Sequence, residues 1–217
     1  PNPVSATLMD TSYIINHLGE ERERYLNAVS VPVFQTSNFC FRTVAEMRSA
    51  ITDEVAHPFY TRGNNPTVQV LRRKVAALEG TEDALVFGSG CAAISAAVMS
   101  NVKSGDHVVC VSNPYSWTDK LLNAFLVRYG VSATMIDGTD PANYERAIRP
   151  ETRLLYLESP NTMTFELQDI EAVVRIARKQ GLVTVIDNSC AGFGNQNPAA
   201  LGVDIIVHSA SKYVGGH

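Results

Sequence analysis

The sequence predicts an α/β fold in which a mostly parallel sheet is covered by helices on both faces. After residue 42, short aliphatic and β-branched runs alternate with stretches of helical periodicity, as in βαβ units. These runs are apolar almost throughout, and strands of that kind are buried on both faces, as in parallel sheets. With 217 residues, 45% of them hydrophobic, the chain can bury one core.

Six apolar runs are predicted to be strands, at residues 84–87, 107–111, 132–136, 153–158, 182–187 and 204–209. Two segments beside them have helical spacing. Leu71, Val75 and Leu78 share one face of a helix that Gly80 can end. A second helix precedes Gly181, and its apolar face is formed by Ile170, Val173, Val174 and Ala177.

Composition and charge argue against several classes of protein. The formal net charge is -4 and no run is rich in Lys or Arg, which disfavours binding to nucleic acids or anionic membranes. The four cysteines form no C-x-x-C pair and no histidine lies at a metal-ligand spacing from them, so we expect no metal site. Without a membrane-spanning stretch or a signal peptide, a cytoplasmic protein is expected.

Polar segments follow most of the predicted strands. In parallel sheets, ligands bind beyond the carboxyl ends of the strands. We therefore expect five segments to converge at one edge of the sheet, namely residues 88–90, 113–115, 159–161, 188–189 and 209–212.

The segment FGSGCAAISAAV joins a predicted strand to a helix of small residues through a glycine turn. Free backbone amides and the positive end of the helix dipole would make it a seat for an anion such as phosphate. The same pattern also occurs as a plain tight connection. A nucleotide-binding Rossmann domain is a further alternative, although GSGCAA lacks the third glycine of the dinucleotide fingerprint.

Two ionisable residues stand at the ends of predicted strands. Asp187 ends the strand LVTVID, where its carboxylate either caps a turn or pairs with a cationic group of a ligand. Lys212 follows the strand DIIVHS, with Ser209 and Ser211 beside it. A desolvated amine is a good nucleophile toward an aldehyde. Together with the glycine turn, an amine, hydroxyls and a carboxylate describe a pocket for pyridoxal 5'-phosphate (PLP).

The same segments resemble the Cys/Met metabolism, or trans-sulfuration, family of PLP-dependent enzymes, which includes cystathionine β- and γ-lyases, cystathionine γ-synthase and methionine γ-lyase. HSASKYVGGH resembles the lysine signature of this family, and YTRGNNPT resembles its Y-x-R-x-x-N-P-T segment. GSGCAA resembles S-S-G-M-A-A, and IDNSCAGFG resembles the segment that begins V-D-N-T. The resemblance covers roughly residues 31 to 217 and corresponds to the N-terminal half of the family's enzymes.

The resemblance implies the type I, aspartate-aminotransferase-like fold of PLP-dependent transferases. Residues 1–42 would form an N-terminal arm contacting a partner subunit. Residues 43–217 would form the PLP-binding large domain, incomplete at its C-terminal end, with the C-terminal domain absent from this chain. The family further implies a homodimer or homotetramer with shared active sites.

Catalytic roles follow from the resemblance. Lys212 would hold PLP as an internal aldimine and then remove the Cα proton of the substrate. Asp187 would pair with the pyridine nitrogen, and Tyr115 would stack on the ring.

Other residues would bind the cofactor. The phosphate would contact the amides of Gly90 and Cys91 and the hydroxyls of Ser209 and Ser211. Tyr60 and Arg62 would reach the phosphate from a neighbouring subunit. Asn161 would approach the ring oxygen, although it is shifted by one position from the asparagine in the family's S-P-x-N-P segment.

The implied reaction is carbon–sulfur lysis of cystathionine or a related sulfur amino acid by α,β-elimination, or by α,γ-elimination. ESPNTMTFELQDI resembles β-lyases more than γ-synthases. Tyr115-Ser116-Trp117-Thr118 replaces the usual Y-G-G-T and is expected to place Trp117 near the ring. A cystathionine γ-synthase, an O-acylhomoserine sulfhydrylase and a non-catalytic cofactor-binding fragment remain alternatives.

Overall fold

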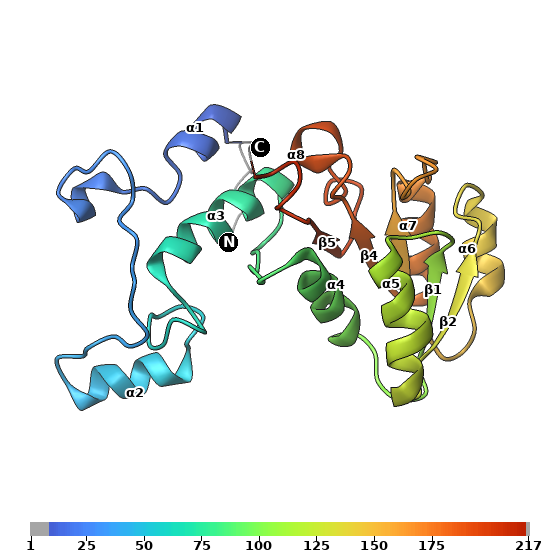
Figure 1. Ribbon diagram of the computed structural model, residues 1–217, viewed down its shortest axis with the longest axis horizontal. Helices are drawn as coiled ribbons and strands as arrows, with labels where there is room; N and C mark the ends of the chain where they lie inside the picture. The colour runs from blue at the N-terminus through green and yellow to red at the C-terminus, as the bar shows by residue number, and fades with distance from the viewer. Residues whose placement is uncertain (1–8, 216–217) are drawn as a thin grey trace. The chain divides into compact units, whose positions relative to one another are not determined.

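The computed structural model describes residues 9–215 of the chain. Residues 1–8 of the predicted arm, and Gly216 and His217 at the end of the lysine motif, lie outside the described residues. The chain divides into two compact units, Pro1–Val86 and Phe87–His217 (Figure 1). The predicted role of residues 1–42 as an arm on a partner subunit, and of residues 43–217 as one domain, stays a prediction.

The described part of the first unit is helical, with α1 (Thr11–Asn16), η1 (Arg22–Tyr25), α2 (Val44–Thr52) and α3 (Pro66–Glu79). The side chain of Asn65 accepts a hydrogen bond from the Thr67 amide at 2.9 Å, and Pro66 begins α3 with its backbone already suited to a helix. Gly80 ends α3 in the left-handed conformation, at φ 72°. The predicted end of this helix is confirmed.

The apolar residues predicted to share a face of α3 are not its most buried residues. Leu71 is 43% exposed, whereas the buried residues are Arg72, Ala76 and Glu79. The guanidinium of Arg72 donates from Nε to the Ala84 carbonyl at 2.7 Å and forms an ion pair with Asp83. Apolar spacing located the helix, but the residues buried on α3 include two charged ones, Arg72 and Glu79.

The second unit contains a five-stranded sheet in which every neighbouring pair is parallel, in the order β2-β1-β3-β4-β5. The strands are β1 (His107–Val111), β2 (Ser132–Ile136), β3 (Thr152–Glu158), β4 (Val183–Asp187) and β5 (Ile205–Val207). The predicted parallel sheet is confirmed, and each of these five strands lies within one residue of its predicted limits except β5, which is shorter at both ends.

The predicted strand at residues 84–87 is wrong, because this segment has no strand conformation in the structure. Leu85, Val86 and Phe87 are 67%, 46% and 40% exposed. An apolar run becomes a strand only when a neighbouring backbone satisfies its N–H and C=O groups. The Ala84 carbonyl instead accepts a hydrogen bond from the Arg72 side chain.

Helices cover both faces of the sheet, as Figure 1 shows. On one face, α4 (Gly90–Met99) and the continuous helical segment α5, η2 and η3 (Ser116–Lys120, Leu121–Phe125, Leu126–Tyr129) pack in a cluster with Val108, Cys110, Leu154 and Tyr156. On the other face, α6 (Pro141–Ala147) and α7 (Ile170–Gln180) pack against Val109, Leu155, Leu157 and Ile186. A short helix, α8 (Gly192–Asn195), follows β4. Alternate residues of each central strand therefore point to opposite cores.

Helix α7 matches the prediction in both its buried face and its end. Its buried residues are those predicted, Ile170, Val173, Val174 and Ala177. Gly181 ends it at φ 65°, where a residue with a side chain would be strained. Among residues 9–215, no helix is long and apolar enough to cross a bilayer.

We expect truncation of a central strand residue to destabilise the second unit. Leu155 is fully buried in β3, so Leu155→Ala should lower the free energy of unfolding by about 2–5 kcal/mol. Chemical denaturation followed by circular dichroism measures this loss. The matched control is Val127→Ala, because Val127 is 54% exposed. Equal effects of the two substitutions would contradict the packing described here.

Candidate active site

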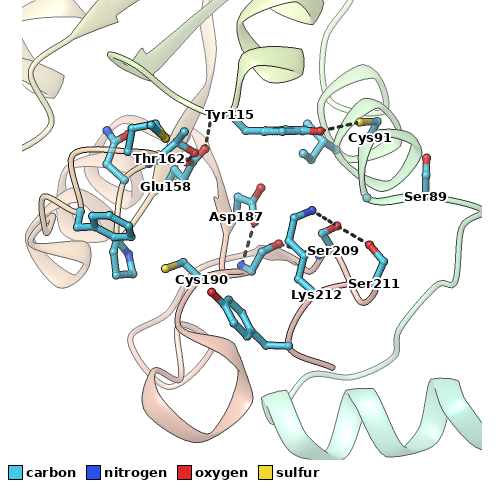
Figure 2. A pocket seen from close by; sticks show the side chains of 18 of the residues that line it. Ser89, Cys91, Tyr115, Glu158, Thr162, Asp187, Cys190, Ser209, Ser211 and Lys212 are labelled. Atoms are coloured by element: carbon cyan, nitrogen blue, oxygen red, sulfur yellow. Dashed lines mark hydrogen bonds between the residues drawn. The ribbon is translucent and has the colours of Figure 1, made fainter. Parts of the chain in front are cut away.

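A cavity of about 430 Å³ opens at the carboxyl ends of the strands of the second unit (Figure 2). All five segments predicted to converge at this edge contribute to the cavity. Residues 113–115 contribute Tyr115 alone, and residues 188–189 contribute Ser189 alone. The lining residues are Gly88, Ser89, Gly90, Cys91, Ile94, Tyr115, Glu158, Pro160, Asn161, Thr162, Met163, Phe165, Asp187, Ser189, Cys190, Ser209, Ser211, Lys212 and Tyr213.

Lys212 lies in the turn that follows β5. Its Nζ donates a hydrogen bond to Ser209 Oγ at 2.7 Å and lies 5.6 Å from the centre of the Tyr115 ring. Within the described part of the chain, Lys212 forms no ion pair. Its amine is therefore held at the cavity by a neutral hydroxyl and lies near an aromatic face.

Asp187 is the last residue of β4 and is only 7% exposed. Its Oδ1 accepts a hydrogen bond from the Ser189 amide at 3.0 Å, so the carboxylate does cap a turn. Oδ2 has no partner among residues 9–215. Because Oδ2 keeps some exposure at the cavity, a cationic group bound there can pair with it. Asp187 can therefore cap the turn through Oδ1 and still offer Oδ2 to a cationic ligand group, so the two interpretations from the sequence do not exclude each other.

Tyr115 directly precedes α5. Its amide donates to Glu158 Oε2 at 2.8 Å, and its phenol oxygen lies 3.8 Å from the Cys91 sulfur. Figure 2 shows the ring edge-on, on the opposite side of the cavity from Ser209 and Lys212. The contact with Cys91, together with burial and the negative charge of Asp187, raises the pKa of Tyr115 above its usual value.

The start of α4 forms an anion seat with the turn after β5. Ser89 caps the helix by accepting from the Ala92 amide at 3.1 Å, and the amides of Gly90 and Cys91 have no acceptor within residues 9–215. A Cβ on Gly90 would lie 2.7 Å from Ser209 Oγ, so only glycine permits this close approach. Ser211 Oγ lies 3.5 Å from Ser209 Oγ. Two free amides and two hydroxyls at a helix N-terminus fit a phosphate group.

Glu158 is a residue of the cavity that no sequence motif indicated. It ends β3, is 5% exposed, and pairs in register with Asp187 of β4. Its Oε1 accepts from the amide of Thr162 at 2.8 Å and also from the Thr162 hydroxyl. Burial raises the pKa of Glu158, the three hydrogen bonds oppose that rise, and the charge of Asp187 adds to it. Its position at the end of a predicted buried strand, like that of Asp187, was the available signal.

Asn161 lines the cavity and is 2% exposed. Its Nδ2 donates to the Ser112 carbonyl at 2.8 Å, while the buried Oδ1 has no partner among the described residues. An orphaned amide oxygen at this place is consistent with a ligand that carries a donor. The predicted contact of Asn161 with the ring oxygen of the cofactor stays a prediction.

Trp117 does not lie where the sequence suggested. It does not line the cavity, is 55% exposed, and packs its ring against Lys120, whose Nζ lies 4.3 Å from the ring centre. The next residue, Thr118, is fully buried and lies 3.4 Å from the hydroxyl of Tyr156. The helical turn that buries Thr118 directs Trp117 away from the cavity.

Tyr60 and Arg62 belong to the first unit, where the guanidinium carbon of Arg62 lies 4.8 Å from the centre of the Tyr60 ring. Their predicted contact with the phosphate of a neighbouring subunit stays a prediction. No group of three or more metal-ligating side chains occurs in the part of the chain that the structure describes.

Comparison with known proteins identifies the family. The model of the family described as Cys/Met metabolism PLP-dependent enzyme matches residues 10–217. A probable cystathionine γ-synthase of Herpetosiphon aurantiacus is 40% identical over 201 residues, which are 93% of this chain and 60% of that protein. A cystathionine β-lyase of Staphylococcus haemolyticus is 42% identical over 158 residues, which are 73% of this chain and 40% of that protein.

A solved structure shares the fold. A Campylobacter jejuni protein described as an O-acetylhomoserine (thiol)-lyase, whose crystal structure contains a pyridoxyl-lysine adduct, has a TM-score of 0.91 and 29% identity. The match covers 96% of this chain and 51% of that protein, so this chain spans about half the length of the relatives it matches. The predicted fold is confirmed, and PLP, the cofactor predicted from the sequence, is the cofactor of the family. The chain belongs to the Cys/Met metabolism family of PLP-dependent enzymes.

Proposed function

We propose that this protein is a PLP-dependent carbon–sulfur lyase that acts on cystathionine or a related sulfur amino acid by α,β-elimination or α,γ-elimination. One observation carries the proposal. A lysine amine, a buried carboxylate with an unpaired oxygen, and a seat of amides and hydroxyls all face one cavity, in a chain of this family. When bound, PLP supplies an electron sink that stabilises negative charge at the Cα of an amino acid.

Lys212 is proposed to hold the cofactor and to take the proton from the Cα of the substrate. Its amine is fixed by Ser209 and has no carboxylate partner among residues 9–215. A base or nucleophile must lie within reach of the reacting atoms, and Lys212 lines the cavity that would hold them.

Asp187 is proposed to hold a proton on the ring nitrogen. Its Oδ1 is fixed by the Ser189 amide, so Oδ2 is kept at the cavity in one orientation. The negative charge of a buried carboxylate favours the protonated form of a neighbouring nitrogen.

Several residues are proposed to bind the rest of the cofactor. The phosphate would be held by the amides of Gly90 and Cys91 and by the hydroxyls of Ser209 and Ser211. Asn161 would form a hydrogen bond near the ring oxygen of the cofactor. Tyr60 and Arg62 would reach the phosphate from a neighbouring subunit of a dimer or tetramer. The planar guanidinium of Arg62 suits phosphate oxygens.

We further propose that the protein is located in the cytoplasm.

Tyr115 is proposed to stack on the ring and to move protons to and from the substrate. A tyrosine phenol is protonated near neutral pH, as a proton donor to a leaving sulfur requires, and the contact with Cys91 raises the pKa of Tyr115 further.

A second candidate function is γ-replacement, as in cystathionine γ-synthases and O-acylhomoserine sulfhydrylases. The names of two of the three relatives described above favour it. The segment ESPNTMTFELQDI, which resembles β-lyases, favours elimination. These reactions share the same cofactor and the same Cα chemistry, so the residues of the cavity serve either one.

The covalent role of Lys212 can be tested directly. After loading with PLP and reduction with borohydride, peptide mass analysis should find a pyridoxyl group on Lys212. Lys212→Ala should carry none and should lose at least about a hundredfold of any turnover, as expected for loss of a positioned base. Lys120→Ala is the control, because Lys120 contacts Trp117 away from the cavity. An adduct on another lysine, or none, would contradict the proposal.

The reaction can be identified from its product. With cystathionine as the substrate, α,β-elimination releases pyruvate and α,γ-elimination releases 2-oxobutyrate, and both can be separated by chromatography. We expect pyruvate. Cystathionine formed from cysteine and an acylhomoserine would instead establish γ-replacement, and no product in any of these assays would support a non-catalytic fragment.

The contact between Cys91 and Tyr115 predicts a pH effect. Because the contact raises the pKa of Tyr115, Cys91→Ala should lower that pKa toward the ordinary value for tyrosine. Ultraviolet difference titration should then detect the tyrosinate of this residue at a lower pH, and Tyr115→Phe should remove the signal. Cys40→Ala, at an exposed cysteine, should leave the titration unchanged. If Cys91→Ala also leaves the tyrosinate titration unchanged, the contact with Cys91 does not raise the pKa of Tyr115.

A further inference from the structure

We propose that Glu158 is a positioning residue whose carboxylate connects two loops at the cavity, one that carries Tyr115 and one at residues 159–169. The consequence for a cofactor rests on the proposed function, because it is the PLP ring against which Tyr115 would be held. The bridge itself concerns only residues of this chain, and it is tested separately.

The two oxygens of Glu158 have different tasks. Oε2 accepts from the amide of Tyr115, 43 residues earlier in the chain, at 2.8 Å. Oε1 accepts from the amide of Thr162 at 2.8 Å and from its hydroxyl. Both Tyr115 and Thr162 line the cavity. One side chain at the end of β3 therefore fixes the backbone of two separate walls of the cavity (Figure 2).

The burial of Glu158 indicates that its negative charge serves to accept hydrogen bonds. It is 5% exposed, and no ion pair of Glu158 occurs among the described residues. A buried carboxylate without a cation requires several hydrogen-bond donors, and hydrogen bonds to a charged acceptor are stronger than neutral ones. The neighbouring Asp187 makes the burial more costly still, because the two carboxylates pair in register on adjacent strands.

The loop that Glu158 holds has an unfavourable backbone. Met163 and Phe165 have φ values of 64° and 57°, in the left-handed region that bulky side chains rarely adopt. Their side chains also line the cavity. Such a conformation persists only where surrounding contacts impose it. The two hydrogen bonds from Thr162 to Glu158 are directly beside Met163, so the carboxylate helps to impose it.

The test replaces Glu158 by glutamine in the full chain. Glutamine keeps the size of the side chain, but one of its two ends is an NH₂ group and cannot accept from an N–H. We expect the amide of Tyr115 or that of Thr162 to exchange hydrogen about tenfold faster or more, as measured by residue-resolved hydrogen exchange. We expect affinity for PLP to fall about tenfold and the visible circular dichroism of the bound cofactor to change.

The matched control is Glu166→Gln. Glu166 is an exposed carboxylate on the same loop whose side chain accepts from the Thr164 hydroxyl at 3.0 Å. The Glu166→Gln variant should leave both the hydrogen exchange of the Tyr115 and Thr162 amides and the visible spectrum of the cofactor unchanged. A role of Glu158 in stability alone would lower the melting temperature but leave the visible spectrum and PLP affinity of the folded variant as in the wild type, and that result would overturn the proposal.

Two further measurements keep the proposal testable if Glu158→Gln does not fold. In the unmodified chain, exchange of the Tyr115 and Thr162 amides at the rate of exposed amides would refute the bridge. Thr162→Val, which removes only the hydroxyl, should weaken PLP binding and alter the visible spectrum in the same direction as Glu158→Gln, and no change would count against it. If the unmodified chain binds no PLP, the proposed function fails, while amide exchange still decides the role of Glu158.

Discussion

The parallel pairing of β1, β3, β4 and β5 is the constraint on which the candidate active site depends. Because neighbouring strands run in the same direction, the residues that follow them emerge at one edge of the sheet. Glu158 and Asp187 are the last residues of adjacent strands and pair in register. Lys212 and Tyr115 follow two others. Residues nearly a hundred positions apart in the sequence therefore share one cavity.

The burial of two carboxylates at this edge carries an electrostatic cost. The structure resolves it differently for each. Glu158 is satisfied by N–H and O–H donors of the protein, whereas Asp187 keeps one oxygen without a partner among the described residues. A carboxylate that is fully hydrogen-bonded holds structure, and one that is only half paired is available to a ligand. The assignment of Asp187 to the cofactor and of Glu158 to the loops rests on this difference.

Local chemistry made much of the fold predictable. Gly80 and Gly181 end α3 and α7 as expected, because glycine alone takes the left-handed conformation without strain. Five of the six predicted strands occur, since an unbroken apolar run is stable only inside a covered sheet. Residues 84–87 have the same apolar character but no strand partner in the described chain. Composition shows that a segment prefers burial, and it does not show whether a neighbour is there to pair with it.

The sequence by itself determined the types of group at the site and the family to which the chain belongs, because an amine, a carboxylate, hydroxyls and glycine amides are properties of residue type and spacing. The tertiary structure alone decided which atoms of those groups are already occupied. It turned Trp117 away from the cavity, placed the Cys91 sulfur against the phenol of Tyr115, and made Glu158 a bridge. These outcomes depend on the directions of side chains and on hydrogen bonds between distant segments, which spacing along one chain does not encode.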